Sequence, residues 1–387
     1  MRLSDKMDIF TSSIFVYLAG KKDEAEARGM EVINLSVGTP DLPPPPHVVA
    51  AMRAALDDAG SFKYAIVDRP SLIGAAREWY LRRYGVELSD AEICTLNGSQ
   101  DGLAHLPLVL LNPGDIALVP NPGYPIFRNA PIIASGHIYD MPLTEDNGFI
   151  PKLEDIPHSI AAKARLMVLS FPSNPLGRLA PPEFFDKAIW FARRHGIAIL
   201  HDNAYSELVY DGRQGGSFLS CPGASEVGIE FNSLSKSHNM SGMRVSFALG
   251  NRQLVGALRC FKSNIDYGVF PAVQHAAEAA LRGSQECVFN LRETYEKRRN
   301  ILVAGLAAAG WKIDPPEATM FAWARIPEGY KSSMDFCMDM VERAGVMFVP
   351  GIAFGSLGEG YVRIALVQPE AKIKCACERI TGVLQAV

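Results

Sequence analysis

The sequence lacks the features of a membrane protein and of a nucleic-acid-binding protein. None of its apolar runs approaches the roughly 18 to 20 residues that a membrane-spanning helix needs. Lysine and arginine number 38 and aspartate and glutamate 42, which gives a net charge of −4 over 387 residues. Binding to nucleic acid or to an anionic membrane calls for an excess of basic residues. We therefore expect neither a membrane nor a nucleic acid among the partners of this chain.

The chain also lacks a cysteine pattern that would indicate disulfides or a metal site. Its seven cysteines are scattered, only Cys375 and Cys377 lie close together, and the eight histidines do not cluster. Such thiols in a long chain are typical of a reducing compartment. The apolar stretch 9–20 is interrupted by hydroxyl residues, which favours an N-terminal helix over a signal peptide. We expect a cytoplasmic protein without a bound metal.

Three common nucleotide and hydrolase motifs are missing as well. There is no G-x-G-x-x-G after a strand, no Walker lysine motif and no G-x-S-x-G nucleophile elbow. Nicotinamide-dependent, ATP-dependent and serine-hydrolase functions therefore lose their main support. Hydrophobic residues make up 48% and charged residues 21% of the chain, as in ordinary globular proteins.

Short β-rich runs alternate with helical patterns through the middle of the chain. The runs are 116–119, 166–170, 197–200, 228–231 and 245–249. The clearest helix begins at Pro181-Pro182 and ends with a basic turn before Gly196, because proline suits a first turn and glycine ends a helix. This alternation predicts a mostly parallel α/β sheet covered by helices on both faces.

The chain divides into three parts. Residues 1–46 form an N-terminal arm that contributes to a small domain and ends in four consecutive prolines, an extended connector. Residues 47–285 form the large, ligand-binding domain. Residues 286–387 begin with a long charged helix, at about 291–309, and form a smaller α+β domain.

Polar residues follow several of the apolar runs, and open α/β sheets bind ligands beyond the carboxyl ends of their strands. Asp202 ends one run, where a buried carboxylate is costly unless a cation such as a protonated pyridine nitrogen meets it. Tyr205 is placed to reach the same ligand. Asn174 lies in an Asn-Pro-x-Gly segment, which is either a simple turn or points into the strand-end crevice. A capping or surface role for Asp202 stays open on these grounds.

Two further segments are suited to binding an anion. Ser99 and Gln100 precede an apolar helical stretch, and the N–H groups at a helix start bind phosphate; an ordinary N-cap at Ser99 is the alternative. The segment 232–244 brings Lys236, Arg244 and several hydroxyls into one connection between strands, unless it is only a solvated loop.

Arg363 lies inside an apolar strand-like run near the end of the chain. The planar fork of an arginine binds a carboxylate through two parallel hydrogen bonds. Arg363 therefore faces either the carboxylate of a substrate or an acidic side chain in an internal ion pair.

Together these segments resemble the class I and II aminotransferases of the pyridoxal 5′-phosphate (PLP) fold type I, over nearly the whole chain and in the family's order. The markers are Gly98-Ser99-Gln100, Asn121-Pro-Gly-Tyr124-Pro125, Asn174-Pro-x-Gly177, Asp202-x-x-Tyr205, Ser233-x-Ser235-Lys236 with Arg244, and Arg363. Six markers with family-like spacing make the resemblance specific. It implies an α/β fold with a mostly parallel, seven-stranded sheet between helices and a smaller α+β domain.

The resemblance also assigns roles to these residues. Lys236 would carry PLP as a Schiff base and then move a proton between the substrate and the cofactor. Asp202 would keep the ring nitrogen protonated, and Tyr205 would hydrogen-bond the ring oxygen with Asn174. Lys236, Asp202 and Tyr205 are the expected catalytic residues. The other expected contacts are Tyr124 with the ring, Ser99, Gln100, Ser233, Ser235 and Arg244 with the phosphate, and Gly38, Asn174 and Arg363 with the substrate.

Members of this family are dimers with shared active sites. The resemblance therefore implies a homodimer in which Tyr64 reaches the cofactor and Asn264 the substrate of the partner subunit.

Within the family, the sequence is most similar to the LL-diaminopimelate aminotransferases. The resemblance is carried by residues 98–107, 112–115, 262–266, 350–351 and 358–360. Ser13 stands where those enzymes have a tyrosine, Tyr267 where they have a small residue, Met243 where they have tryptophan and Leu176 where they have threonine. The expected reaction moves an amino group from an amino acid to a 2-oxo acid, with LL-diaminopimelate and 2-oxoglutarate as one pair. Aspartate, alanine or aromatic donors, a carbon–sulfur lyase and a non-enzymatic regulator are the alternatives.

Overall fold

The structure is a computed structural model that describes residues 1–10 and 13–385. Its central feature is a seven-stranded sheet in the order β2-β8-β7-β6-β5-β3-β4, in which only β8 runs antiparallel to its neighbours. The strands are β2 (Ile93–Leu96), β3 (Ile116–Asn121), β4 (His137–Pro142), β5 (Ala164–Ser170), β6 (Ala198–Asn203), β7 (Gly228–Ser233) and β8 (Ser246–Gly250). The predicted mostly parallel α/β sheet is confirmed.

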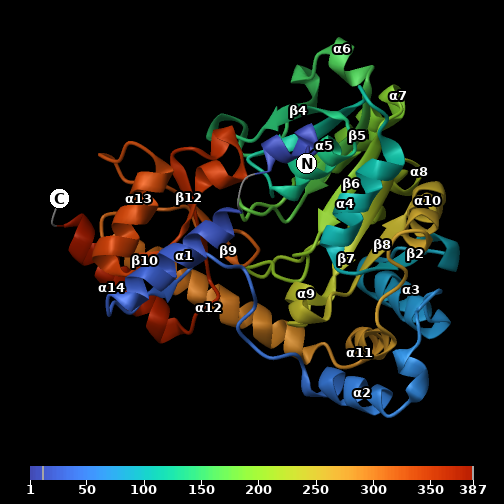
Figure 1. Ribbon diagram of the computed structural model, residues 1–387, viewed down its shortest axis with the longest axis horizontal. Coiled ribbons are helices and arrows are strands. Elements are labelled where there is room, and N and C mark those ends of the chain that lie inside the picture. Colours follow the sequence, from blue (N-terminus) through green and yellow to red (C-terminus); the bar gives the residue numbers. More distant parts are fainter. Residues whose placement is uncertain (11–12, 386–387) are drawn as a thin grey trace.

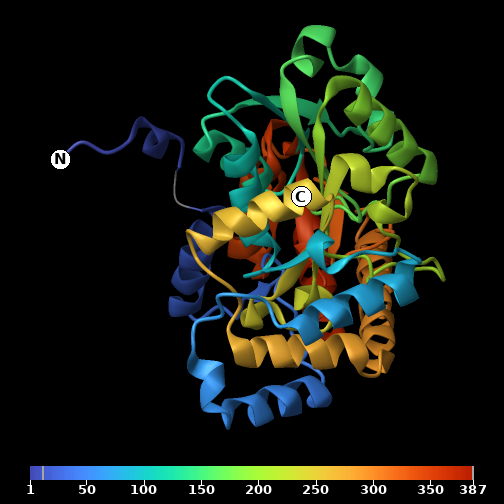
Figure 2. The same cartoon turned by 90° about the vertical axis from the view of Figure 1, so that its right-hand side faces the viewer.

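Helices cover both faces of this sheet (Figure 1, Figure 2). One face packs against α4 (Ser99–Leu110), α5 (Ile126–Ile133) and α10 (Arg252–Ser263). The opposite face is covered by α3 (Pro70–Tyr84), α7 (Pro182–His195) and α11 (Pro271–Arg282), and α2 (Pro46–Leu56) packs on α11. The short helices α6 (His158–Ala161), α8 (Ala224–Val227) and α9 (Leu234–Ser237) lie in the connections. As predicted, α7 has proline at its first turn and ends at Gly196, which is left-handed with φ 66°.

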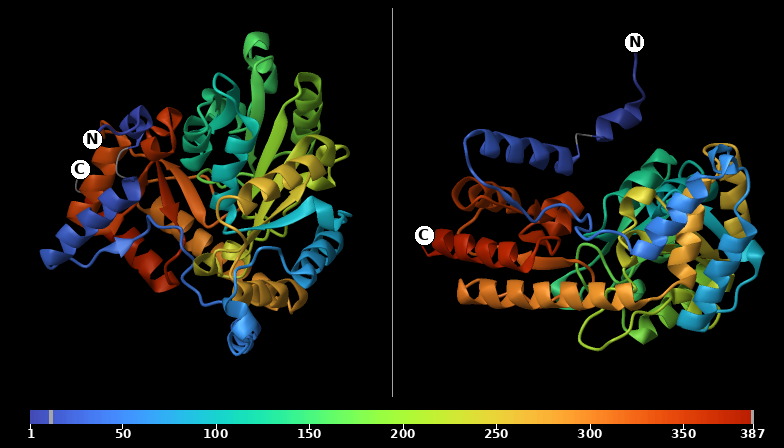
Figure 3. Two further views of the ribbon diagram at one scale, coloured as in Figure 1. Left: turned by 45° about the vertical axis from the view of Figure 1, so that its right-hand side comes forward. Right: turned by 90° about the horizontal axis from the view of Figure 1, so that it is seen from below.

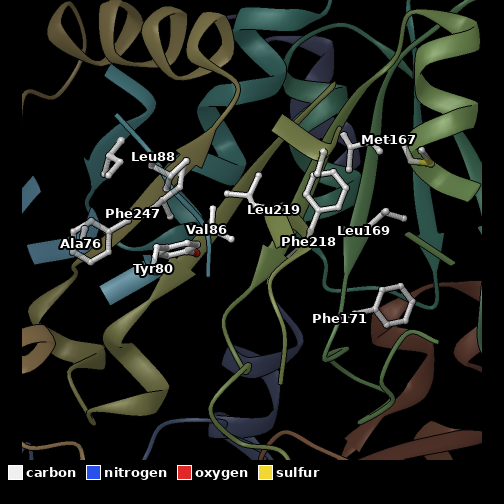
Figure 4. Close-up of a cluster of buried hydrophobic side chains, with 14 of the residues drawn as sticks. Ala76, Tyr80, Val86, Leu88, Met167, Leu169, Phe171, Phe218, Leu219 and Phe247 are labelled. Atoms are coloured by element: carbon white, nitrogen blue, oxygen red, sulfur yellow. The ribbon is translucent and has the colours of Figure 1, made fainter. Parts of the chain in front are cut away.

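The side chains of each strand point alternately to the two faces of the sheet and so contribute to two separate hydrophobic cores. On β6, Ile199 joins the core under α3 and α7, whereas Leu200 joins the core under α4 and α10, because successive strand residues point to opposite faces. Figure 4 shows the first of these cores, with Phe218, Leu169 and Tyr80 among its side chains. The same alternation sends His201 and Asp202, the next two residues of β6, to opposite sides of the sheet.

A smaller body lies beside the sheet (Figure 1, Figure 3). It has an antiparallel sheet of β11 (Val349–Pro350), β12 (Tyr361–Ala365) and β9 (Phe321–Arg325), with helices α13 (Ser333–Asp339) and α14 (Glu370–Leu384). The long helix α12 (Glu286–Ala308) runs from the large body into it, as the right-hand view in Figure 3 shows. A hydrophobic core of its own gathers residues from α12, α14, β9 and β12.

The N-terminal segment belongs structurally to this smaller body. Helix α1 (Ile14–Ala27) packs on it, and β1 (Ile33–Asn34) pairs in parallel with β10 (Val346–Met347). Beyond β1, Asp41 accepts two hydrogen bonds from the buried Arg298 of α12, at 2.7 and 2.8 Å. This ion pair fixes the connector that leads to α2. Within the described residues, no helix is both long and apolar enough to cross a membrane.

Candidate active site

A pocket of about 290 Å³ opens at the carboxyl edge of the sheet, between the large and the small body. Asp202 stands near the end of β6, Ser233 ends β7, and Asn174 follows β5, so parallel strands deliver these side chains to one edge. Helix α9, which carries Lys236, follows β7 directly (Figure 1). Arg363 enters from the small body on β12.

The pocket collects every predicted site residue except Tyr64 and Asn264. Its lining includes Gly38, Ser99, Gln100, Tyr124, Asn174, Asp202, Tyr205, Ser233, Ser235, Lys236, Arg244 and Arg363. These residues come from at least seven separate segments of the chain. The sequence therefore predicted correctly that they converge, while their individual roles remain predictions.

Lys236 and Asp202 both line the pocket, and the pKa of each is shifted toward the neutral range. The ammonium of Lys236 donates a hydrogen bond to the Gly38 carbonyl at 2.8 Å. Burial lowers the pKa of Lys236 to about 8, aided by the charges of Arg363 and Arg244 and opposed by that of Asp202. Burial raises the pKa of Asp202 to about 6, against the charges of His201 and Lys236. A lysine that loses its proton near neutral pH is suited to act as a nucleophile and a base.

One oxygen of Asp202, Oδ1, is buried and has no hydrogen-bond partner in the described structure. A buried carboxylate oxygen without a donor is costly. Asp202 therefore points at the place where a cationic donor of a ligand fits.

The start of α4 and Arg244 make an anion cradle. Gly98 is the N-cap of α4, with φ 83°, and a Cβ atom there would clash with the guanidinium of Arg244. Ser99 is the first residue of the helix and its buried Oγ lacks a partner, so the predicted alternative of an N-cap at Ser99 is wrong. Free backbone N–H groups, an unpaired hydroxyl and an arginine together suit a phosphate.

Arg363 is buried and its charge is not matched by any carboxylate among the described residues. Its guanidinium donates to Asn174 Oδ1 at 3.0 Å and to the Ser36 carbonyl at 2.8 Å, while Nε has no partner. The rings of Phe321 and Phe354 lie 4.1 and 4.8 Å from it. An internal ion pair, one of the two predicted explanations, is therefore not what Arg363 makes within these residues. A carboxylate from a ligand is the partner its chemistry calls for.

Several apolar residues of the pocket were not predicted. Phe15 comes from α1, Val37 from the segment after β1, Leu103 from α4 and Phe321 from β9. The glycine at position 38 gave a partial signal, because a Cβ atom there would overlap the ring of Phe321. Nothing in the local sequence marks the other three, which look like ordinary core residues.

Tyr64 and Asn264 lie outside the pocket of a single chain. Tyr64 is 82% exposed and packs on Tyr267 with ring centroids 5.6 Å apart. Asn264 is exposed and donates to the Cys260 carbonyl at 2.9 Å. Their predicted contacts with a partner subunit are not tested by this structure.

One group of potential metal ligands among the described residues is already paired with a lysine. Asp101, His105 and Asp266 bring potential ligand atoms together, but the ammonium of Lys262 already pairs with both carboxylates, at 2.9 Å from Asp266 Oδ2. The ammonium of Lys262 thus already neutralises the carboxylates that a metal ion would need as ligands.

A family model described as "Aminotransferase class I and II" matches residues 30–380. The chain belongs to this family. The match spans both bodies and every residue of the pocket except Phe15, so the whole architecture is that of an aminotransferase. The protein is an enzyme that transfers amino groups.

Individual proteins that are similar to this chain in sequence or in structure include other aminotransferases. An LL-diaminopimelate aminotransferase of Syntrophobacter fumaroxidans is 43% identical over 97% of each chain. The substrate-bound structure of BacF from Bacillus subtilis is 37% identical, covers 99% of this chain and 98% of its own, and has a TM-score of 0.95. A mutant aspartate aminotransferase of Thermus thermophilus is 28% identical, covers 99% and 100%, and has a TM-score of 0.92.

Proposed function

We propose that this aminotransferase binds PLP through Lys236 and moves amino groups between an α-amino acid and a 2-oxo acid. The observation that carries the proposal is the convergence of three sites in one 290 Å³ pocket: Lys236 with its lowered pKa, Asp202 with its unpartnered oxygen, and the anion cradle at α4. An aldehyde, a pyridine nitrogen and a phosphate are the three groups that PLP presents to them.

The mechanism assigns distinct tasks to the side chains. Bound PLP supplies an electron sink for the charge that develops on the substrate α-carbon. Asp202 holds the proton of the ring nitrogen, and Lys236 carries the proton that leaves the α-carbon. The hydroxyl of Tyr205 is neutral at physiological pH and can donate a hydrogen bond, since burial raises its pKa well above the usual value.

Asn174 links the substrate and cofactor sides of the pocket. Its Oδ1 accepts from Arg363, so its amide N–H groups are left to face the cofactor oxygen. Arg363 in turn orients the α-carboxylate of the substrate through its planar fork. We propose that this pair sets the angle at which the substrate meets Lys236.

LL-diaminopimelate is the first candidate donor, with 2-oxoglutarate as acceptor, because relatives at 40 to 44% identity carry that name. A second candidate, a donor with a neutral or aromatic side chain, is favoured by Phe15, Val37 and Leu103, which line the pocket. Among the described residues that line the pocket of a single chain, Asp202 is the one with a carboxylate. In the proposed site this carboxylate pairs with the ring nitrogen of the cofactor. A distal ammonium would find no other acidic partner there.

A screen of the first half-reaction tests the function and separates the donors. We expect LL-diaminopimelate to convert the bound cofactor to its pyridoxamine form, and 2-oxoglutarate to reverse the change, followed by the absorption spectrum. Aspartate, glutamate, alanine and phenylalanine are run side by side under the same conditions. Release of pyruvate and ammonia without an oxo acid would instead identify a lyase, and no conversion by any amino acid would contradict the proposed function.

The capture of PLP by Lys236 should depend on pH, because only the neutral amine is nucleophilic. With a pKa of about 8, the neutral fraction rises about tenfold per pH unit up to that value and levels off above it. We expect the initial rate of capture, measured by borohydride reduction between pH 6 and 10, to follow this curve. N-acetyl-lysine run in parallel reports an unshifted amine, and an identical profile for the protein would contradict the lowered pKa.

We further propose a homodimer in which Tyr64 and Asn264 complete the partner's site. Its support is an exposed apolar surface on two adjacent segments, joined by the hydrogen bond from Gly268 N to the Ala65 carbonyl at 2.9 Å. The exposed side chains are Phe62, Tyr64, Ile66, Val67, Ile265, Tyr267 and Phe270. Apolar surface gathered in this way is typical of a subunit interface.

The remaining parts of the proposal concern the domains and the location of the enzyme. We assign residues 47–285 to a PLP-binding domain and residues 286–387, with the arm 1–46, to a smaller domain; their separate hydrophobic cores support this division. We also propose a cytoplasmic location. All seven cysteines are free, which fits a reducing compartment.

A further inference from the structure

A buried lysine lies beside the first turn of α4, the helix whose start belongs to the anion cradle. The side chain of Lys262, from α10, is 6% exposed and pairs with two carboxylates. One belongs to Asp101, in the first turn of α4, whose side chain is 7% exposed. The other belongs to Asp266, whose Oδ1 and Oδ2 accept from the ammonium at 3.0 and 2.9 Å. Lys262, Asp101 and Asp266 do not line the pocket and lie behind the helix start.

These contacts hold the backbone that leads into α4. Oδ2 of Asp101 accepts a hydrogen bond from the backbone N–H of Asn97 at 2.7 Å, in addition to the one from Lys262. The side chain of Asn97 in turn donates to Asp266 Oδ2 at 3.2 Å. The segment 97–101, which contains the helix start of the cradle, is therefore bonded to the end of α10 and the residues after it through its first and its last residue.

The charge of Asp101 would oppose the binding of a phosphate if it were not paired. A carboxylate in the first turn stabilises a helix, because it meets the positive end of the helix dipole. The same carboxylate repels a second anion at that helix start, and salt screens such a repulsion only weakly when the charge is buried. The ammonium of Lys262 offsets the charge of Asp101 at hydrogen-bond distance, so the helix start stays available to an anion.

We propose that Lys262 is a positioning residue for the phosphate of PLP: it neutralises Asp101 and fixes the segment 97–101, while Asp266 holds its ammonium in place. The inference rests on the proposed function and extends it, because it gives a task to three residues outside the pocket lining. Removal of the cation leaves Asp101 as an unpaired buried anion next to the cradle. The loss should therefore fall on the phosphate and not on the ring or the aldehyde of the cofactor.

Two probes that share the ring and the aldehyde test this role. The cofactor-free protein is titrated with PLP and with pyridoxal, which lacks the phosphate, and the dissociation constants are read from the absorption of the ring. We expect the wild type to bind PLP more tightly than pyridoxal. Lys262→Met should lose about tenfold in affinity for PLP and little for pyridoxal, as an unpaired charge near a helix start predicts.

A second substitution separates the charge of Lys262 from its packing. The double variant Lys262→Met/Asp101→Asn lacks the unpaired carboxylate, while the new amide oxygen can still accept from the N–H of Asn97. It should regain most of the lost PLP affinity, a recovery that a purely structural role of Lys262 does not predict. Asp101→Asn alone leaves Lys262 paired with Asp266 and should keep the preference for PLP. This variant tests the inference even if Lys262→Met does not fold.

Two controls remove other side chains and leave Lys262 in place. Arg299 of α12 is 5% exposed and pairs with Asp211 at 2.7 Å, so Arg299→Met should lower the thermal stability but keep the preference for PLP. His105→Gln removes the imidazole whose Nδ1 lies 2.6 Å from Asp101 Oδ1, and it should keep the preference too. Equal losses for both probes in Lys262→Met, no recovery in the double variant, or a lost preference in Asp101→Asn or His105→Gln would overturn the inference. A wild type that binds neither probe would instead contradict the proposed function.

Discussion

Replacing Lys236 with alanine is expected to abolish covalent capture of PLP and to lower turnover by about 10⁴-fold or more. Lys236 is the single lysine lining the pocket in the part of the chain that the structure describes, and burial brings its pKa to about 8. No neighbouring amine is therefore placed to take over its two tasks. The measurements are borohydride trapping followed by peptide mass analysis, and the rate of the donor half-reaction.

Two controls separate chemistry from charge and from folding. Lys236→Arg keeps a cation beside the Gly38 carbonyl but offers no nucleophilic amine, so it should be as inactive as the alanine variant. Lys187→Ala, on the exposed side of α7, should leave both measurements unchanged. PLP should still bind Lys236→Ala without a covalent link, through the anion cradle and Asp202. An adduct trapped undiminished in Lys236→Ala would refute the assignment.

The polar half of the pocket could be predicted from the sequence because of how parallel strands work. Asp202 and Asn174 follow apolar runs that are far apart along the chain, but parallel strands bring their carboxyl ends to the same edge. The cation-rich connection between β7 and β8 then had to lie at that edge too, which placed Lys236 and Arg244. Arg363 was recognisable because an arginine within an apolar strand needs an anionic partner.

Short and edge strands could not be predicted from the same patterns. Strand β4 lies at the edge of the sheet and most of its residues are partly or fully exposed, so its sequence shows no apolar run. Strand β2 has four residues, too few for a period to appear. Both were missing from the predicted set, although the helical stretch after Gln100, which connects β2 to β3, was recognised.

Contacts between segments far apart in the chain could not be predicted from the sequence either. Phe15 and Phe321 are 306 positions apart and share the pocket only because α1 folds onto the small body. His201 and Glu230 were passed over for a similar reason: their pairing depends on the register of β6 with β7, which places them side by side. Polar residues on the core side of a buried strand look, in sequence, like ordinary loop residues.

Replacing Arg363 with alanine is expected to lower kcat/KM by about 100-fold for every amino acid, mainly through KM. The fork of Arg363 is buried and its charge is unmatched among the described residues, so the substrate carboxylate would be its counter-ion. Removing the arginine leaves that carboxylate without its counter-ion. Arg363→Lys keeps the charge but not the two parallel bonds, so it should recover about tenfold of the loss.

The control for this arginine lies on the neighbouring strand. Arg325 of β9 is exposed and pairs with Glu145 at 2.7 Å, so Arg325→Ala should leave KM unchanged. PLP affinity decides between a substrate role and a structural one, because Arg363 also supports Asn174 and the Ser36 carbonyl. If Arg363→Ala raises KM while PLP still binds normally, the arginine acts on the substrate. An unchanged KM for all donors would mean that its fork serves only to join β12 to the residues around it.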